Sequence, residues 1–114
     1  ELSQVECENE IRQLHDYMSE NYNYEMSLFR PPMGEFSEFS LAVTSNCGYE
    51  TMLWSYAYED WNVDNQPEPK ASLEKLTNAL HDGAIYLLHS VSSTNAEILG
   101  DFIDNAENTG YVFK

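Results

Sequence analysis

Hydrophobic residues recur along this chain with two different periods, and this change of period limits its fold more than any other feature. The first stripe repeats every three or four residues, as one face of a helix does, and consists of Cys7, Ile11, Leu14 and Met18. Ser3 and Glu6 precede it at the spacing of a capping box. The sequence therefore predicts an N-terminal helix that ends near Asn21.

The next three segments alternate between apolar and polar residues, which is typical of half-buried strands. They cover residues 22–30, 36–44 and 49–61, with turns at Pro31–Gly34 and Asn46–Gly48 between them. Three consecutive strands joined by short turns predict an antiparallel meander. Residues 62–70 carry two prolines and read as a long loop.

The sequence of the C-terminal half predicts two further helices with one buried segment between them in the chain. Ser72 is the expected N-cap of the first helix, and Thr94 with Glu97 has capping-box spacing for the second. The expected apolar face of this second helix consists of Ile98, Leu99, Phe102, Ile103 and Ala106. Between the two helices, Ala84 to Val91 is a buried strand, with a helix as the alternative, and residues 111–113 add a short edge strand. The predicted fold is a single α+β domain over residues 1–114. It has an antiparallel sheet of three to five strands and about three helices mainly on one face.

The charge of the chain restricts its partners. Twenty Asp and Glu face five Lys and Arg, so the formal net charge is −15. Direct contact with nucleic acid or with an anionic membrane surface is therefore not expected. The favoured partner is a basic protein.

No apolar run is long enough to span a membrane, and Cys7 and Cys47 do not form a disulfide framework. A cytoplasmic protein is expected, with its oligomeric state open.

The sequence shows no spacing that is typical of catalysis. The three histidines, His15, His81 and His89, lack a second ligand at zinc-site spacing, and no phosphate-binding glycine motif occurs. We therefore expect no enzyme, no catalytic residue, no metal site and no cofactor. An enzyme would require a pocket that joins His89 or His81 to carboxylates or to Cys47.

Two groups of residues are candidates for partner binding. One is an acidic row at helical spacing, Glu97, Asp101 and Asp104. The other combines aromatic and acidic side chains near the predicted loop and consists of Tyr58, Glu59, Asp60, Trp61 and Asp64. Aromatic residues beside carboxylates suit a partner rich in Lys and Arg. The alternative is a solvated helix face and a strand whose aromatics face the core.

These observations predict a non-enzymatic inhibitor. Its acidic surface would imitate nucleic acid and block a basic nucleic-acid-acting protein, such as a nuclease or toxin, with affinity that falls as salt rises. The alternative is an adaptor or immunity-type protein that binds through hydrophobic contacts and is acidic only for solubility.

Overall fold

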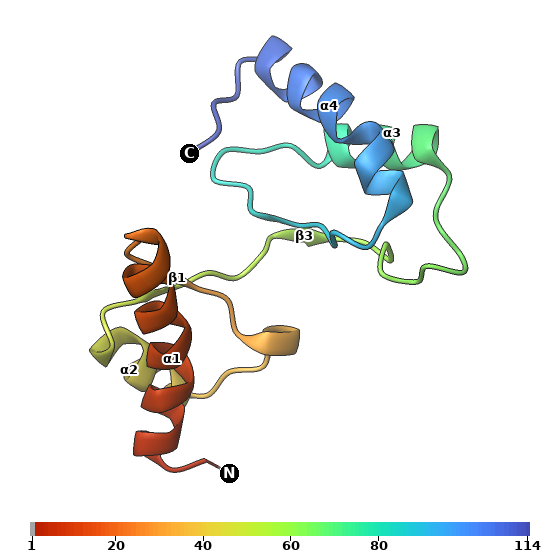
Figure 1. The fold of residues 1–114 in the computed structure, drawn as a ribbon. Coiled ribbons are helices and arrows are strands. Elements are labelled where there is room, and N and C mark those ends of the chain that lie inside the picture. The colour runs from red at the N-terminus through yellow and green to blue at the C-terminus, as the bar shows by residue number, and fades with distance from the viewer. Residues whose placement is uncertain (1) are drawn as a thin grey trace. The chain divides into compact units, whose positions relative to one another are not determined.

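The computed structural model describes residues 2–114, and the chain divides into two compact units, Glu1–Leu53 and Trp54–Lys114. Figure 1 shows the elements of each unit. The first contains α1 (Gln4–Tyr22), β1 (Leu28–Phe29), a 3-10 turn (Pro32–Gly34), α2 (Glu38–Asn46) and β2 (Glu50–Thr51). The second contains β3 (Tyr56–Ala57), α3 (Pro69–Asn78), β4 (Tyr86–Leu87) and α4 (Ser93–Asn108). The prediction of a single domain stays a prediction.

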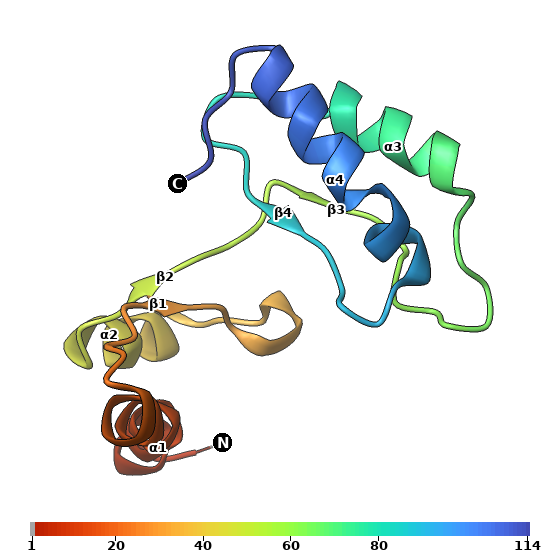
Figure 2. The same cartoon turned by 45° about the horizontal axis from the view of Figure 1, so that its top comes forward.

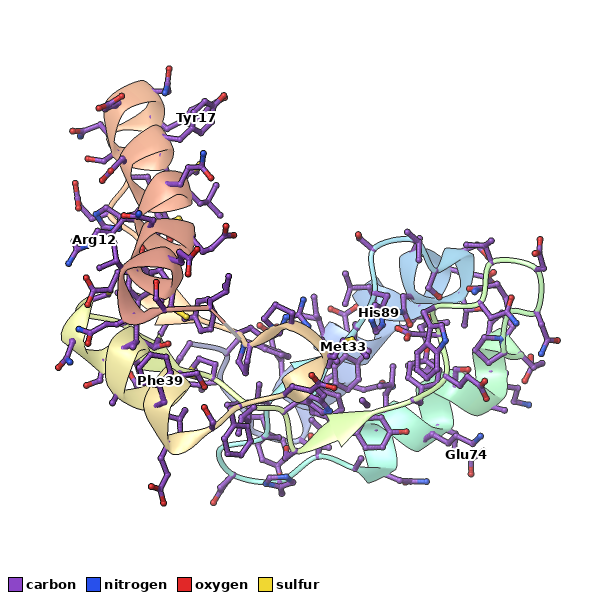
Figure 3. The ribbon with its side chains drawn as sticks, turned by 90° about the horizontal axis from the view of Figure 1, so that it is seen from below. Arg12, Tyr17, Met33, Phe39, Glu74 and His89 are labelled. Atoms are coloured by element: carbon purple, nitrogen blue, oxygen red, sulfur yellow. The ribbon has the colours of Figure 1, made fainter. Side chains whose placement is uncertain are left out.

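Helix α1 begins where its capping signal places it. The Ser3 hydroxyl accepts a hydrogen bond from the Glu6 main chain, and the Glu6 carboxylate accepts one from Ser3 N–H at 2.8 Å. This confirms the predicted capping box. No residue of α1 is buried within the described part of the chain, and its side chains, Arg12 and Tyr17 among them, surround the helix (Figure 3). Its apolar stripe is therefore only partly covered.

The segment predicted as a strand over residues 36–44 is a helix. Ser37 caps α2, because its hydroxyl accepts from Ser40 N–H at 3.1 Å and the Ser40 hydroxyl accepts from Ser37 N–H at 2.8 Å. Val43 and Thr44 are both buried. Successive residues of a strand point to opposite faces, so a half-buried strand would bury only one of these two neighbours. The alternation seen in the sequence therefore did not describe the packing of this segment.

The strand pairs are parallel, so the predicted antiparallel meander is wrong. In the first unit Leu28 pairs with Glu50 and Phe29 with Thr51, and α2 lies between the two strands in the chain. In the second unit β3 pairs with β4, and α3 lies between them. Each unit thus contains a strand–helix–strand connection, which parallel pairing requires. Of the three long predicted strands, residues 22–30 and 49–61 contain only the two-residue strands β1, β2 and β3, and residues 36–44 contain none.

The core of the second unit lies between its two helices and its strand pair. Leu76 of α3 packs with Ile98 and Phe102 of α4, and all three are buried. Figure 2 shows α3 and α4 side by side beyond β3 and β4. The half-buried residues that pack against this core are Tyr56, Tyr58, Leu73, Leu80, Tyr86 and Leu88. The apolar face predicted around Ile98 and Phe102 is confirmed, whereas Leu99 is exposed.

Both helices of this unit begin earlier than their predicted caps. Glu68 caps α3, since its carboxylate accepts from Lys70 N–H at 3.0 Å and from Ala71 N–H at 2.7 Å. These bonds hold the pKa of Glu68 below its ordinary value. Ser92 caps α4, so Thr94 lies inside the helix. Residues 111–113 form no strand.

Candidate active site

The site is built at one end of the β3–β4 pair. Asp60 lies three residues after β3, and His89 lies two residues after β4. Because parallel neighbours end at the same edge of a sheet, the loops that follow β3 and β4 meet there, and functional groups commonly gather at such carboxyl ends. The register that pairs Tyr56 with Tyr86 and Ala57 with Leu87 brings the two loops together.

Asp60 and His89 make two contacts with each other. The main-chain N–H of His89 donates to Asp60 Oδ2 at 2.7 Å, and His89 Nδ1 lies 2.7 Å from Asp60 Oδ1. Asp60 is 0% exposed, whereas the His89 side chain is 36% exposed. A carboxylate oxygen only accepts, so the proton of a neutral His89 ring sits on Nδ1. Its Nε2 makes no hydrogen bond to any residue of the described chain.

The contacts of Asp60 keep it ionised. Burial raises the pKa of Asp60, and this is the largest single influence. The hydrogen bonds from His89 N–H, from the Asn95 amide and from the His89 ring act in the opposite direction, as does the His89 charge. Together they hold the pKa of Asp60 below its ordinary value. A buried anion therefore stands beside an accessible imidazole.

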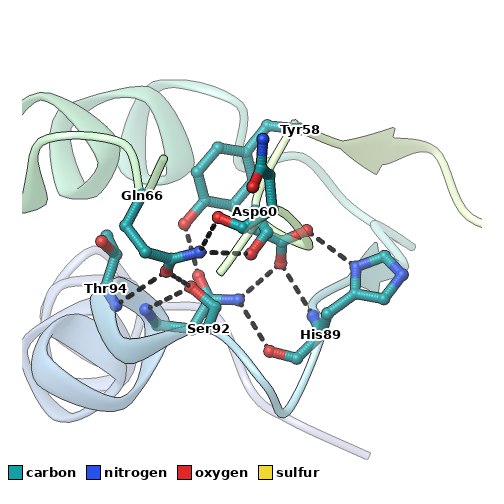
Figure 4. A network of polar contacts seen from close by, with 8 residues as sticks. Tyr58, Asp60, Gln66, His89, Ser92 and Thr94 are labelled. Atoms are coloured by element: carbon teal, nitrogen blue, oxygen red, sulfur yellow. Dashed lines mark hydrogen bonds and ion pairs between the residues drawn. The ribbon is translucent and has the colours of Figure 1, made fainter. Parts of the chain in front are cut away.

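A hydrogen-bond network fixes this pair to the N-terminus of α4 (Figure 4). Gln66 Nε2 donates to the Asp60 carbonyl at 3.0 Å, and Ser92 Oγ donates to Gln66 Oε1 at 2.7 Å. Ser92 Oγ also accepts from Asn95 N–H at 3.1 Å, and Thr94 Oγ1 donates to the carbonyl of Pro67 at 2.7 Å. Within residues 2–114, no buried side-chain polar atom lacks a partner. The long loop is thereby anchored rather than merely solvated.

Substitution Ser92→Ala tests this anchor. Ser92 is buried, and alanine removes both the cap of α4 and the donor to Gln66, so we expect the free energy of unfolding to fall by about 1–2 kcal/mol. Ser93→Ala is the matched control, because Ser93 is exposed at the first position of the same helix. Urea unfolding measures both variants. Equal losses from the two would contradict a capping role for Ser92.

The residues predicted to bind a partner are divided by the structure. Glu97, Asp101 and Asp104 are exposed on α4, and this row as a binding surface stays a prediction. In the second group Glu59, Trp61 and Asp64 are exposed and Tyr58 is half-buried. Asp60 differs from all of them, because it is fully buried and turned toward His89. The rings of Trp61 and His89 pack in a T-shaped arrangement with a centroid distance of 5.7 Å.

The other two histidines have separate surroundings. His15 contacts Tyr49 through Nδ1 at 2.6 Å and Glu25 through Nε2 at 3.0 Å. His81 is exposed and contacts Ser55 Oγ at 3.1 Å and the Asp82 carbonyl at 3.0 Å. Among residues 2–114, no group of three or more His, Cys, Asp or Glu is placed to hold a metal ion. Of the two histidines that the enzyme alternative named, the structure joins His89 to a buried carboxylate.

Sequence reasoning missed Asn95 as a site residue and named His89 only in the enzyme alternative. The available signals were a histidine at the end of an apolar segment and an aspartate within an aromatic cluster. His89 and Asn95 lie 29 and 35 residues from Asp60 in the chain, and only the parallel strand pairing shows that they meet.

Over residues 2–114 the structure has no helix with the length and hydrophobicity of a membrane span.

The chain was compared with known proteins. It is 47% identical over 85 residues to the peptidoglycan-N-acetylmuramic acid deacetylase PdaA of Bacillus subtilis, a match that covers 75% of this chain and 32% of the relative. The solved structure of B. subtilis PdaA, a family 4 carbohydrate esterase, superposes with a TM-score of 0.90 at 36% identity and covers 99% of this chain and 49% of that one. No protein-family model matches.

A second structural neighbour is a CE4 family pseudoenzyme from Bacillus anthracis, with a TM-score of 0.84 and 26% identity over 96% of this chain and 38% of that chain. The chain thus spans about a third of the curated relative and about half of the solved PdaA structure. These likenesses overturn three predictions. They are the antiparallel α+β fold, the nucleic-acid-mimicking inhibitor with its adaptor or immunity-type alternative, and the expectation that the chain is no enzyme. The homologues of this chain are family 4 carbohydrate esterases, among them peptidoglycan deacetylases.

Proposed function

We propose that this chain takes part in removing the acetyl group from N-acetylmuramic acid residues of peptidoglycan. The observation that carries the proposal is the Asp60–His89 pair, which lies in a chain 47% identical over 85 residues to a peptidoglycan-N-acetylmuramic acid deacetylase. A buried carboxylate that orients a partly exposed imidazole is a common arrangement of a general acid or base. The accessible His89 Nε2 is the atom that can exchange a proton.

Deacetylation requires a proton for the departing amine. Water adds to the acetamide carbon, the carbon–nitrogen bond breaks, and acetate and a free amine result. In the proposed step, protonated His89 gives its Nε2 proton to the amine nitrogen as that bond breaks. The proton released by water restores the imidazolium. Asp60 stabilises the imidazolium through Nδ1 and keeps Nε2 turned away from itself.

The structure limits the assignment to these two groups. No cluster of three metal-ligand side chains is present among residues 2–114, so no step is assigned to a metal through residues of this chain. Asp60 and His89 are thus proposed as the acid–base half of the site.

Acetate release from purified peptidoglycan tests the proposal. We expect the full-length protein to release acetate and to leave free amines on muramic acid, which mass spectrometry of the digested glycan distinguishes from free amines on glucosamine. Deacetylated glucosamine alone would overturn the substrate assignment. Binding of peptidoglycan without any acetate would overturn the activity and favour a pseudoenzyme, as in the B. anthracis neighbour.

A further inference from the structure

Asn95 lies behind the Asp60–His89 pair, and its contacts determine how its amide is turned. The side-chain oxygen accepts a hydrogen bond from the Tyr58 hydroxyl. The side-chain nitrogen donates to Asp60 Oδ2 at 2.5 Å and lies 3.3 Å from the His89 carbonyl oxygen. The opposite orientation would place the amide oxygen against two oxygens that only accept. Asn95 is 6% exposed, so water does not offer it other partners.

This amide restricts the rotation of the Asp60 carboxylate. Asp60 Oδ2 receives two N–H groups, one from the His89 main chain and one from Asn95. Oδ1 is left as the acceptor for His89 Nδ1. The hydrogen bonds of the Asn95 side chain go to the Tyr58 hydroxyl, to Asp60 Oδ2 and to the main-chain carbonyl of His89 rather than to its ring. Any influence of Asn95 on proton transfer must therefore pass through Asp60.

We propose that Asn95, oriented by Tyr58, is a positioning residue that holds the Asp60 carboxylate in the one orientation that keeps the proton of neutral His89 on Nδ1 and leaves Nε2 for the substrate. The role rests on the proposed deacetylase function. A carboxylate that is free to turn would lose the fixed bond to Nδ1, and the ring would then populate both tautomers.

The charged and titratable groups around this carboxylate are few. They are His89 from the loop after β4 and Tyr58 from the end of β3, while α4 contributes the neutral Asn95. The Asn95 hydrogen bond is one of the influences that lower the pKa of Asp60 against the effect of burial. Removing it, or replacing it with a second carboxylate, is expected to raise the pKa of Asp60.

Substitution Asn95→Asp keeps the shape of the side chain and removes its N–H donors. In the full-length protein we expect kcat for acetate release to fall about 10- to 100-fold, the range typical of residues that orient a functional group, with KM little changed. The acid limb of the kcat–pH profile moves to higher pH, because Asp60 becomes protonated at higher pH. The ¹⁵N signals of the His89 ring change from one tautomer to a mixture of two.

Two further variants complete the test. Asn105→Asp is the matched control, since Asn105 lies on the same helix and contacts Thr77 at 3.3 Å, and it leaves the profile and the tautomer unchanged. Tyr58→Phe removes only the hydroxyl that orients Asn95, and we expect a smaller change in the same direction. If Asn95→Asp does not fold, as judged by circular dichroism, Tyr58→Phe decides the matter.

The outcomes separate this inference from the proposed function. A tautomer change in the variants of a protein that releases no acetate supports the positioning role and overturns the deacetylase. An active protein whose Asn95→Asp and Tyr58→Phe variants keep the wild-type profile and tautomer overturns the positioning role alone.

Discussion

Substitution His89→Gln is expected to lower kcat for acetate release by about 10²- to 10⁴-fold, the range that positioned general acids and bases contribute. Glutamine keeps the main-chain N–H that donates to Asp60 Oδ2, and its amide can replace the bond to Oδ1. It cannot carry a proton to a leaving amine near neutral pH. The loss should therefore appear in kcat, measured as acetate released from peptidoglycan at saturating substrate.

The control for this variant is His81→Gln. His81 belongs to the same unit, is exposed, and contacts Ser55 and Asp82 rather than a buried carboxylate. We expect His81→Gln to retain wild-type kcat. A His89→Gln protein that folds and releases acetate as fast as the His81→Gln protein would remove His89 from the chemistry.

Substitution Asp60→Ala is expected to lower the free energy of unfolding by about 2–4 kcal/mol, because it leaves the hydrogen-bond donors around a buried carboxylate unsatisfied. The change leaves three donors without an acceptor: His89 N–H, the His89 ring and the Asn95 amide. It also leaves a small cavity, because Asp60 is fully buried. Urea unfolding at neutral pH measures the loss.

The stability lost in the Asp60→Ala variant should be larger at neutral pH than at acid pH. The folded-state pKa of Asp60 lies below its ordinary value, so its contribution is complete above the ordinary range of an aspartate. The contribution disappears as the pH falls through the folded-state pKa. The difference in the free energy of unfolding between wild type and Asp60→Ala should therefore become smaller at acid pH.

Asp64→Ala provides the comparison for this measurement. Asp64 is exposed in the following loop, and only its main-chain N–H makes a bond, to Asn62 Oδ1 at 3.1 Å, which alanine preserves. We expect a change within about 0.5 kcal/mol. A similar small change for Asp60→Ala would show that the buried network contributes little to stability.

The strand predictions failed because a short segment can match both the two-residue period of a strand and the 3.6-residue period of a helix. Residues 36–44 alternate in hydrophobicity, yet Ser37 and Ser40 cap a helix there. Residues 49–61 read as one long strand but contribute two residues to each of two different strand pairs. Alternation also favoured an antiparallel sheet, whereas the intervening α2 and α3 permit parallel pairing. The informative feature was the length of the segment that joins β1 to β2, because a long connection permits parallel pairing. Reading that segment correctly required recognising residues 38–46 as a helix.

The charge argument failed for a different reason. A net charge of −15 counts twenty carboxylates equally, whether they are solvated or buried. The site depends on one of them, Asp60, whose importance comes from being buried among donors rather than from its sign. The acidic composition therefore indicated a surface for a basic partner, whereas the proposed acid–base pair uses a carboxylate that is buried.

Sequence alone determined the features that depend on local geometry. The capping box of Ser3 and Glu6 follows from spacing over a few residues and is confirmed. The predicted apolar face of the last helix is buried at Ile98, Phe102 and Ala106, whereas Leu99, which the prediction included, is exposed. The tertiary structure decided the pairing of β3 with β4 and thereby the meeting of Asp60 with His89. Those two residues lie 29 positions apart, and no local period specifies which distant strand ends lie together.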